Sequence, residues 1–215
     1  PGAAVTTFSS LAVGHEMKAT IKGVQDLKYE VDLESNDGKN VTAEILKAHP
    51  VAAPVTAPTV SADPKKEKPA DLEEVYITAV ISPAEFYVQR ATDSDKIAEM
   101  EEKLFEQYDP LPQVEGDKAE FRDGALCCAR FSQDGAWYRA QILSVEGNKL
   151  QVLFVDYGNS ESVDMSDLKK LSADHKSEPV LATLCCIKGA NAKQSDWPED
   201  IVEELKTAAQ GGEKV

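Results

Sequence analysis

Four aromatic residues and one asparagine gather within residues 131–159, at positions that can converge on one mouth of a small β-structure: Phe131, Tyr138, Phe154, Tyr157 and Asn159. Aromatic faces carry negative charge density, and an enclosed cation gains roughly 0.5–2 kcal/mol per contact. Methylated guanidinium suits such a site, because methylation keeps the charge and removes donors that would bind water or a carboxylate. The five residues therefore predict a cage for a methylated cation, although the aromatics would also suit a small barrel core.

Two predicted strands hold these side chains. Residues 137–145 and 150–155 are rich in aromatic, aliphatic and β-branched residues, and Gly147-Asn148 and Gly158-Asn159 are turn signals that close them. A further strand is expected at residues 125–131, so that Phe131 would end it. This pattern indicates a hairpin inside a small barrel or meander.

Two motifs in this stretch, WYRA at residues 137–140 and FVDYGN at residues 154–159, resemble the Tudor domain of the extended Tudor family. That family includes germline Tudor proteins and Tudor-staphylococcal-nuclease relatives. The resemblance implies a fold that is mainly β with helices (α+β), in which a helix joins a small five-stranded Tudor barrel to a staphylococcal-nuclease-like OB domain. It also implies binding of symmetrically dimethylated arginine in the Arg/Gly-rich N-termini of Piwi proteins.

The family's cage pattern falls on the same five residues of this chain, and each position is filled by a residue of the right type: Phe131, Tyr138, Phe154, Tyr157 and Asn159. The first loop, residues 132–136, is slightly longer than in some relatives. Arg139 and Asp156 stand on neighbouring predicted strands with opposite charge. They predict a cross-strand pair that braces the cage, and the alternative is that Asp156 adds negative potential to the pocket itself.

No catalytic, cofactor-binding or metal-binding residue is predicted. The pairs Cys127-Cys128 and Cys185-Cys186 lack metal-ligand spacing, and they indicate reduced core residues with one member of each pair facing inward. The three histidines are isolated in the sequence. A nuclease would need clustered carboxylates for a metal and arginines for the developing charge, and the four arginines are not grouped in that way. The chain is therefore not expected to be an enzyme.

The formal net charge of −15 argues against a basic nucleic-acid-binding face and favours a cationic partner such as an Arg-rich peptide; the acidity would also serve solubility alone. No apolar run of 18 or more residues is present, which predicts no membrane span and a soluble, intracellular protein. The family resemblance narrows the expected location to the cytoplasm, in germ granules or perinuclear nuage.

Periodicity and turn signals predict the remaining elements along the chain. The expected elements are strands at residues 17–24, 27–33, 75–80, 85–90, 161–163 and 181–187, helices at 41–48, 94–108 and from 198 to 209, and a short helical turn at 165–171. Helix 94–108 presents apolar residues at Ile97, Met100, Leu104 and Phe105, with Ser94 or Asp95 as its cap, and Ser195-Asp196 starts the last helix.

These elements imply five regions. They are a β-β-α unit of a nuclease-like fold at 1–48, a Pro/Ala/Lys-rich linker at 49–70, the first nuclease-like strands and the linking helix at 71–110, the Tudor barrel at 111–175, and a last nuclease-like strand and helix at 176–215. The family resemblance implies that the nuclease-like half should still receive a strand pair and a further helix after residue 209. We expect residues 12–48 to fill that place, within one chain or by exchange between two chains.

The predicted function is a non-catalytic reader and scaffold module of the piRNA pathway that binds dimethylarginine in Arg/Gly-rich peptides of Piwi or Argonaute proteins. Two alternatives stay open, a scaffold that binds peptides independently of methylation and a methyl-lysine reader. No cofactor and no direct contact with nucleic acid is expected.

Overall fold

The computed structural model describes residues 16–25, 28–36, 38–48, 73–111, 120–190 and 197–209. The chain divides into two units, which we treat separately. The barrel unit comprises Gly14–Ala91 and Leu184–Val215, and the sheet unit is described within Thr92–Thr183. The predicted linker at 49–70 and the predicted helix start at Ser195-Asp196 lie outside the described residues.

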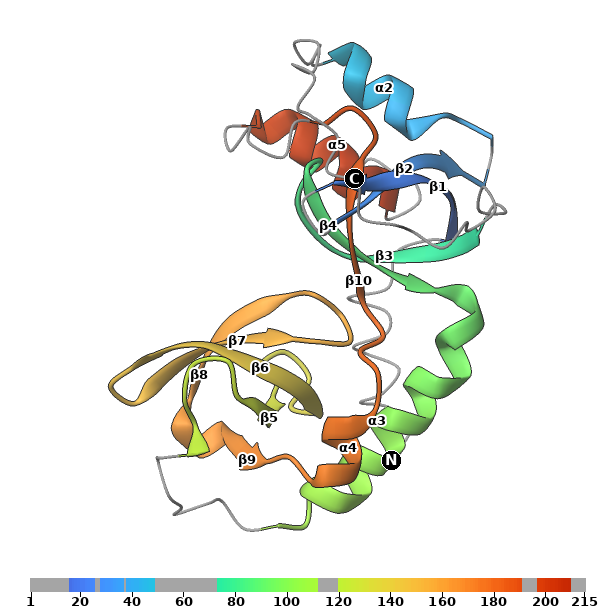
Figure 1. The fold of residues 1–215 in the computed structure, drawn as a ribbon. Coiled ribbons are helices and arrows are strands. Elements are labelled where there is room, and N and C mark those ends of the chain that lie inside the picture. The colour runs from blue at the N-terminus through green and yellow to red at the C-terminus, as the bar shows by residue number, and fades with distance from the viewer. Residues whose placement is uncertain are drawn as a thin grey trace, which may run out of the picture. The chain divides into compact units, whose positions relative to one another are not determined.

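The barrel unit is a closed five-stranded barrel in the order β1-β2-β10-β4-β3 (Figure 1). Its strands are β1 (Glu16–Gln25), β2 (Lys28–Ser35), β3 (Glu73–Ser82), β4 (Glu85–Arg90) and β10 (Thr183–Ile187), and its helices are α2 (Val41–Ala48) and α5 (Glu199–Ala209). Strand β1 pairs antiparallel with β2 and β3, whereas β10 pairs parallel with β2. Residues from both ends of the sequence thus close one barrel within one chain.

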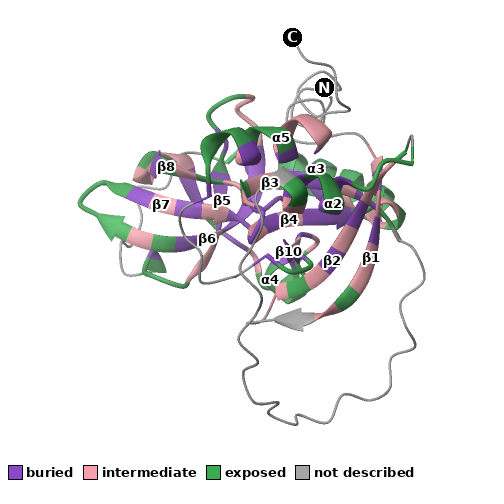
Figure 2. Ribbon diagram, turned by 90° about the horizontal axis from the view of Figure 1, so that it is seen from above, coloured by how far each residue is buried: buried purple, intermediate pink, exposed green. Residues whose placement is uncertain are grey.

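Apolar side chains that alternate along these strands fill the barrel, and each helix adds its apolar face. Val31 and Leu33 of β2, Ile45 of α2 and Leu205 of α5 belong to the same buried cluster. Alternation of purple with pink or green along the strands makes the inward and outward positions visible (Figure 2).

The sheet unit holds a five-stranded sheet in the order β8-β7-β6-β5-β9. Its strands are β5 (Leu126–Arg130), β6 (Trp137–Glu146), β7 (Lys149–Phe154), β8 (Ser160–Asp164) and β9 (Leu168–Lys170). The short helix η1 (Ala91–Asp93) precedes helix α3 (Ser94–Tyr108), and η3 (Met165–Asp167) and α4 (Ala173–Ser177) accompany the last strand. Gly147 turns the β6–β7 hairpin with a φ of 66°, which glycine adopts without strain. The predicted α+β class, mainly β with helices, is confirmed.

Helix α3 covers one face of β5. Met100, Leu104 and Tyr108 of the helix form a buried cluster with Cys128, Trp137 and Leu171. On the opposite face of β5, Cys127 packs into the interior of the sheet unit. The strand is therefore buried on both faces.

Four details of the sequence prediction are wrong. All four cysteines are free, as predicted, but both members of each pair are buried, so the expected inward–outward alternation is wrong. For Cys127 and Cys128 the reason is that β5 is covered on both faces. Phe105 is 41% exposed, because at 100° per residue it lies about 80° from the centre of the buried stripe on α3. Residues 168–170 form β9, since they pair with β5 and extend its sheet, and only 165–167 make a helical turn.

The fourth detail is the start of α3. The sequence predicts Ser94 or Asp95 as the N-cap of this helix. The N-cap residue is Asp93 instead, and its side chain makes no capping hydrogen bond. Asp93 has a φ of −98° and a ψ of 2°, outside the extended conformation typical of an N-cap, and its carboxylate accepts a hydrogen bond from Lys96 Nζ at 2.6 Å. Phe131 also differs slightly from expectation, since β5 ends at Arg130 and Phe131 follows it directly.

Candidate functional site

The four aromatic residues of the predicted cage lie together in the sheet unit. Three of their rings stand almost at right angles to one another: the centroids of Phe131 and Phe154 are 5.3 Å apart at 80°, those of Phe131 and Tyr138 6.3 Å apart at 84°, and those of Tyr138 and Phe154 5.9 Å apart at 83°. Tyr157 meets Tyr138 at 5.5 Å and 82°. Rings that stand perpendicular to one another can form adjacent walls of an aromatic cage.

A tight turn places Phe154, Tyr157 and Asn159. The Phe154 carbonyl accepts hydrogen bonds from Tyr157 N at 3.1 Å and Gly158 N at 2.7 Å, and Phe154 N donates to Asn159 O at 2.9 Å. Gly158 has a φ of 87°, which an L side chain rarely adopts. The DYGN sequence therefore fixes the spacing between two rings and the amide.

The loop between β5 and β6 positions Phe131. Phe131 N donates to Ala136 O, and Gly135 N donates to Phe131 O, each at 2.9 Å. The side chain of Asp134 lies inside this loop, where one carboxylate oxygen accepts from Ala136 N at 2.9 Å and the other accepts from Tyr138 Oη at 2.8 Å. The loop thus holds a carboxylate that bonds to the hydroxyl of a cage tyrosine.

The cage is almost closed to solvent. Phe131 is the most accessible of its rings at 7%, and Phe154 is fully buried. Asn159 Oδ1 is also buried, and it has no hydrogen-bond partner among the described residues. A buried acceptor without a donor costs free energy, so this oxygen marks a position where a ligand N–H would be favourable.

Helix α3 supplies a second carboxylate to the cage. Glu101 is 6% exposed and accepts a hydrogen bond from Tyr157 Oη. Burial raises the pKa of Glu101, the bond from Tyr157 lowers it, and the charges of Asp134 and Asp156 raise it further. Burial also raises the pKa of Tyr138 and of Tyr157, and their carboxylate partners add to the rise, so both phenols stay protonated and donate.

Glu101 and Asp134 were not predicted as site residues. A signal for Glu101 was available, because it falls on the same helical stripe as Ile97, Leu104 and Tyr108, where an acidic residue is out of place. The Asp134-Gly135 dipeptide predicts a turn but does not indicate that the carboxylate would reach Tyr138.

Arg139 and Asp156 form the predicted ion pair. Arg139 Nε and Nη2 donate to the two oxygens of Asp156 at 2.8 and 2.5 Å, and both side chains are buried. The guanidinium also donates to three backbone carbonyls of the segment after β9, at His175, Glu178 and Pro179. The pair therefore ties the turn that carries Tyr157 to that segment.

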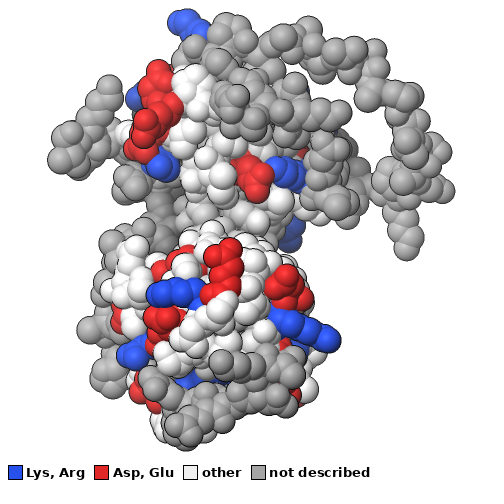
Figure 3. All heavy atoms as spheres, turned by 90° about the vertical axis from the view of Figure 1, so that its left-hand side faces the viewer, with Lys and Arg blue, Asp and Glu red and all other residues white. Residues whose placement is uncertain are grey.

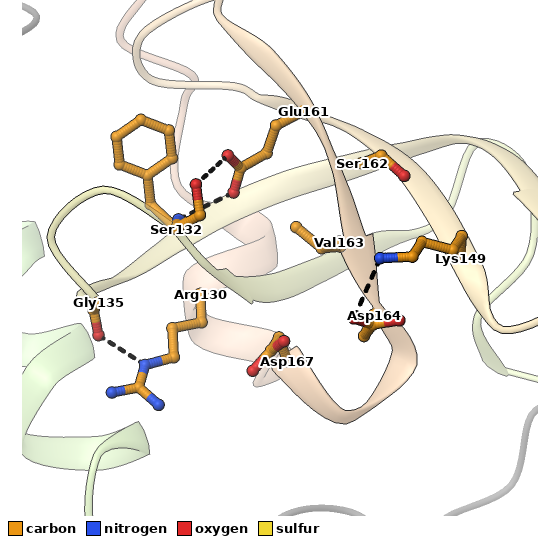
Figure 4. A pocket seen from close by; sticks show the side chains of 10 residues that line it. Arg130, Ser132, Gly135, Lys149, Glu161, Ser162, Val163, Asp164 and Asp167 are labelled. Carbon is orange, nitrogen blue, oxygen red and sulfur yellow. Dashed lines mark hydrogen bonds and ion pairs between the residues drawn. The ribbon is translucent and has the colours of Figure 1, made fainter.

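One surface pocket of about 450 Å³ borders the cage (Figure 4). Phe131 is the residue that lines both the pocket and the cage. Two interactions link residues that line the pocket: Glu161 accepts from Ser132 N and Oγ at 3.0 and 2.8 Å, and Lys149 pairs with Asp164 at 3.2 Å (Figure 4). These interactions fix the outer wall of the loop that carries Phe131.

Within the described residues, no three His, Cys, Asp or Glu side chains are grouped so that they could hold a metal ion. None of the described helices is long and apolar enough to cross a membrane.

Comparisons with known proteins agree with this geometry. A family model described as "Tudor domain" matches residues 67–189. Tudor domain-containing protein 1 of Oryzias latipes is 31% identical over 138 residues, which is 63% of this chain and 12% of that protein. The chain therefore spans only a small part of the length of this relative.

Two solved structures are similar to the chain. The human TDRD1 extended Tudor domain, in complex with a symmetrically dimethylated peptide, has a TM-score of 0.57 and 27% identity, and the match covers 64% of this chain and 69% of that one. The Drosophila melanogaster Papi extended Tudor domain, in complex with a Piwi N-terminal dimethylated peptide, has a TM-score of 0.55 and 27% identity over 64% of this chain and 70% of that one. The chain belongs to the Tudor domain family, and it has the extended Tudor fold.

Proposed function

We propose that this chain is a non-catalytic reader that binds dimethylarginine within Arg/Gly-rich peptides. The observation that carries the proposal is the set of perpendicular rings together with Asn159, whose backbone bonds to that of Phe154 and whose buried Oδ1 has no hydrogen-bond partner among the described residues. A dimethylguanidinium offers flat cationic faces to the rings, methyl groups that fill a dry corner, and a remaining N–H for the amide oxygen. Phe131, Tyr138, Phe154 and Tyr157 would enclose the cation.

Two similar structures support the choice of ligand. The human and fly extended Tudor domains were solved with symmetrically dimethylated or Piwi-derived peptides. By similarity, we propose a symmetrically dimethylated arginine of a Piwi or Argonaute protein as the partner, and a scaffold role in the piRNA pathway within cytoplasmic germ granules. The net charge of −15 favours such a cationic partner through long-range attraction.

The test is a titration of one Arg/Gly-rich peptide in four forms: unmodified, asymmetrically dimethylated, symmetrically dimethylated, and with trimethyl-lysine in place of the methylarginine. We expect the symmetric form to bind most tightly, with a Kd on the order of micromolar, equivalent to about −8 kcal/mol. Asn159→Ala should abolish this preference without unfolding the sheet unit, whereas Asn148→Ala, which alters an exposed asparagine of the same unit, should not.

Other outcomes select the alternatives. Equal binding of all forms would mean that the chain binds peptides independently of methylation, and the closed cage would then be a structural core. Preference for trimethyl-lysine would assign the cage to methyl-lysine. Either result would overturn the proposal.

A further inference from the structure

We propose that Glu101 and Asp134 determine the charge selectivity of the cage, acting through the two tyrosines to favour a cation over a neutral side chain of the same shape. This inference rests on the proposed function. It assigns a specificity role to two residues that lie outside the ring-and-amide set, one on helix α3 and one in the β5–β6 loop.

Each carboxylate is one hydrogen bond away from a wall of the cage. Glu101 accepts from Tyr157 Oη, and Asp134 accepts from Tyr138 Oη at 2.8 Å. The two tyrosines are themselves in contact, with ring centroids 5.5 Å apart. Two acidic groups from separate elements therefore converge on adjacent walls of one site.

Neither Glu101 nor Asp134 forms an ion pair with a lysine or arginine among the described residues, and each accepts from a phenol instead. Arg130 donates to Gly135 O beside Asp134. Arg139 is fully engaged by Asp156 and by three backbone carbonyls. Glu101 is 6% exposed, and its own ionisation is opposed by burial and by the charges of Asp134 and Asp156. A buried carboxylate without a cation costs free energy, and a cation held by the rings would relieve that cost.

Two physical effects link the carboxylates to a bound cation. A phenol that donates to a carboxylate gains electron density on its ring, which strengthens the attraction of the ring face for a cation. The carboxylate also attracts the cation directly, and this attraction is larger in a dry site than in water. Neither effect acts on a neutral ligand.

A purely structural role is the rival explanation, because the same hydrogen bonds also fix the orientation of the two phenols. The amide variants separate the two roles. Glu101→Gln retains an oxygen that accepts from Tyr157 Oη, but it removes the charge. Asp134→Asn removes the charge together with one of two acceptors, because both oxygens of Asp134 accept hydrogen bonds, from Ala136 N and Tyr138 Oη. Glu101→Gln is therefore the variant that decides between the two roles. Glu101→Ala removes both the charge and the acceptor.

The experiment titrates the full chain with two peptides of one Arg/Gly-rich sequence, one with symmetric dimethylarginine and one with neutral citrulline at the same position. We expect Glu101→Gln and Asp134→Asn each to weaken binding of the methylated peptide about tenfold, and citrulline binding to stay as in the wild type. Glu102→Gln is the matched control, since it removes an exposed carboxylate next to Glu101 on the same helix and should change neither titration.

Thermal unfolding accompanies each titration. Glu101→Gln should keep or raise the unfolding midpoint, because burial disfavours the charged form of the wild-type side chain. Weaker binding without loss of stability therefore supports the inference.

Two results overturn it. If Glu101→Gln binds like the wild type while Glu101→Ala binds weakly, the carboxylate only holds the ring. If the variants weaken the methylarginine and citrulline peptides equally, the charge is irrelevant. Failure of the wild type to bind any methylated peptide would instead reject the proposed function, and this inference with it.

Discussion

The sheet unit contains two kinds of buried charged side chain, which differ in the groups that they contact. The Arg139–Asp156 pair satisfies all its groups: the carboxylate also accepts from Leu181 N at 3.1 Å, and the guanidinium reaches three backbone carbonyls. Glu101 forms no such ion pair among the described residues and instead accepts from a phenol. The first arrangement stabilises the fold, and the second places charge beside a binding site.

Removal of one partner of the Arg139–Asp156 pair should be strongly destabilising. Asp156→Asn leaves a buried guanidinium without its counter-charge, and we expect a loss of about 3–5 kcal/mol in the free energy of unfolding. Urea denaturation followed by tryptophan fluorescence measures this loss. Asp164→Asn, which breaks the exposed pair with Lys149, is the control and should cost less than about 1 kcal/mol. Equal losses in both variants would contradict this interpretation.

The grouping of Tyr138, Phe154 and Tyr157 and the Arg139–Asp156 pair could be predicted because these residues lie in two short motifs whose spacing is local. Phe131 lies outside the motifs and follows from the strand that precedes the first of them. Local spacing does not predict the contacts of Glu101 and Asp134 with the cage. Glu101 reaches the cage from helix α3, and Asp134 reaches it through the conformation of the β5–β6 loop. Glu101 bonds to Tyr157 across 56 residues of sequence, a distance at which periodicity carries no information. The direction of a loop side chain such as Asp134 is set by its backbone bonds, and composition does not encode them.

Helix α3 shows how two functions share one helical surface. Its stripe begins with Ile97 and Glu101, which face the cage cluster, and continues with Met100, Leu104 and Tyr108 against β5 and Trp137. Lys169 of β9 strengthens this junction: its ammonium donates to Tyr108 O and Leu111 O and lies 4.1 Å from the centre of the Trp137 ring. The helix therefore anchors the sheet and supplies a carboxylate to the site.

Truncation of the anchoring stripe should destabilise the sheet unit. Leu104 is 1% exposed, and Leu104→Ala should lower the free energy of unfolding by about 2–5 kcal/mol, because it leaves a cavity. Phe105→Ala removes a larger side chain that is 41% exposed, and we expect a change below about 1 kcal/mol. Chemical denaturation of both variants measures the difference, and a larger loss in Phe105→Ala would refute the placement of the stripe.

At the level of elements, helices 41–48 and 94–108 match the sequence prediction, because a 3.6-residue period between clear stop signals defines them. Strand β9 was missed because it has only three residues, and only its pairing with β5 makes it a strand. Helix α4 was missed for a related reason, since its carbonyl at His175 is held by Arg139 and its five residues show no apolar period.

The whole molecule is acidic, but its surface charges are mixed. On the face shown in Figure 3, red Asp and Glu side chains lie beside blue Lys and Arg side chains over the sheet unit. Lys149 and Asp164 of this unit form an exposed pair of opposite charge at 3.2 Å. The chain has 38 acidic and 23 basic residues, so its net charge is negative. This net charge produces a long-range electrostatic field that raises the rate of encounter with a cationic peptide and is screened by salt.

Both units bury free thiols, so the stability of the chain should fall at alkaline pH. Burial raises the pKa of Cys127 in the sheet unit and of Cys185 in the barrel unit to about 12, whereas an unfolded thiol has a pKa of about 8.5. Because the unfolded chain loses these protons first, the free energy of unfolding should fall as pH rises from about 8.5 toward 12, by up to about 1.4 kcal/mol per pH unit for each thiol.

Urea midpoints at pH 7, 8, 9 and 10 measure this slope. Cys127→Ala should make the slope shallower even though the variant is less stable at every pH. An unchanged slope in Cys127→Ala would show that the buried thiol does not control the alkaline response.

The parallel pairing of β10 with β2 has a consequence for synthesis on the ribosome. Strands β1 to β4 are translated before the sheet unit, but the barrel that they form also requires β10, which follows it. During synthesis, all strands of the sheet unit are therefore available before β10 has been translated. At that stage the edge of β2 that pairs with β10 is still unpaired. We expect the sheet unit to fold first and the barrel to close last, so that the exposed edge of β2 is the stage at which the nascent chain is most prone to wrong pairing.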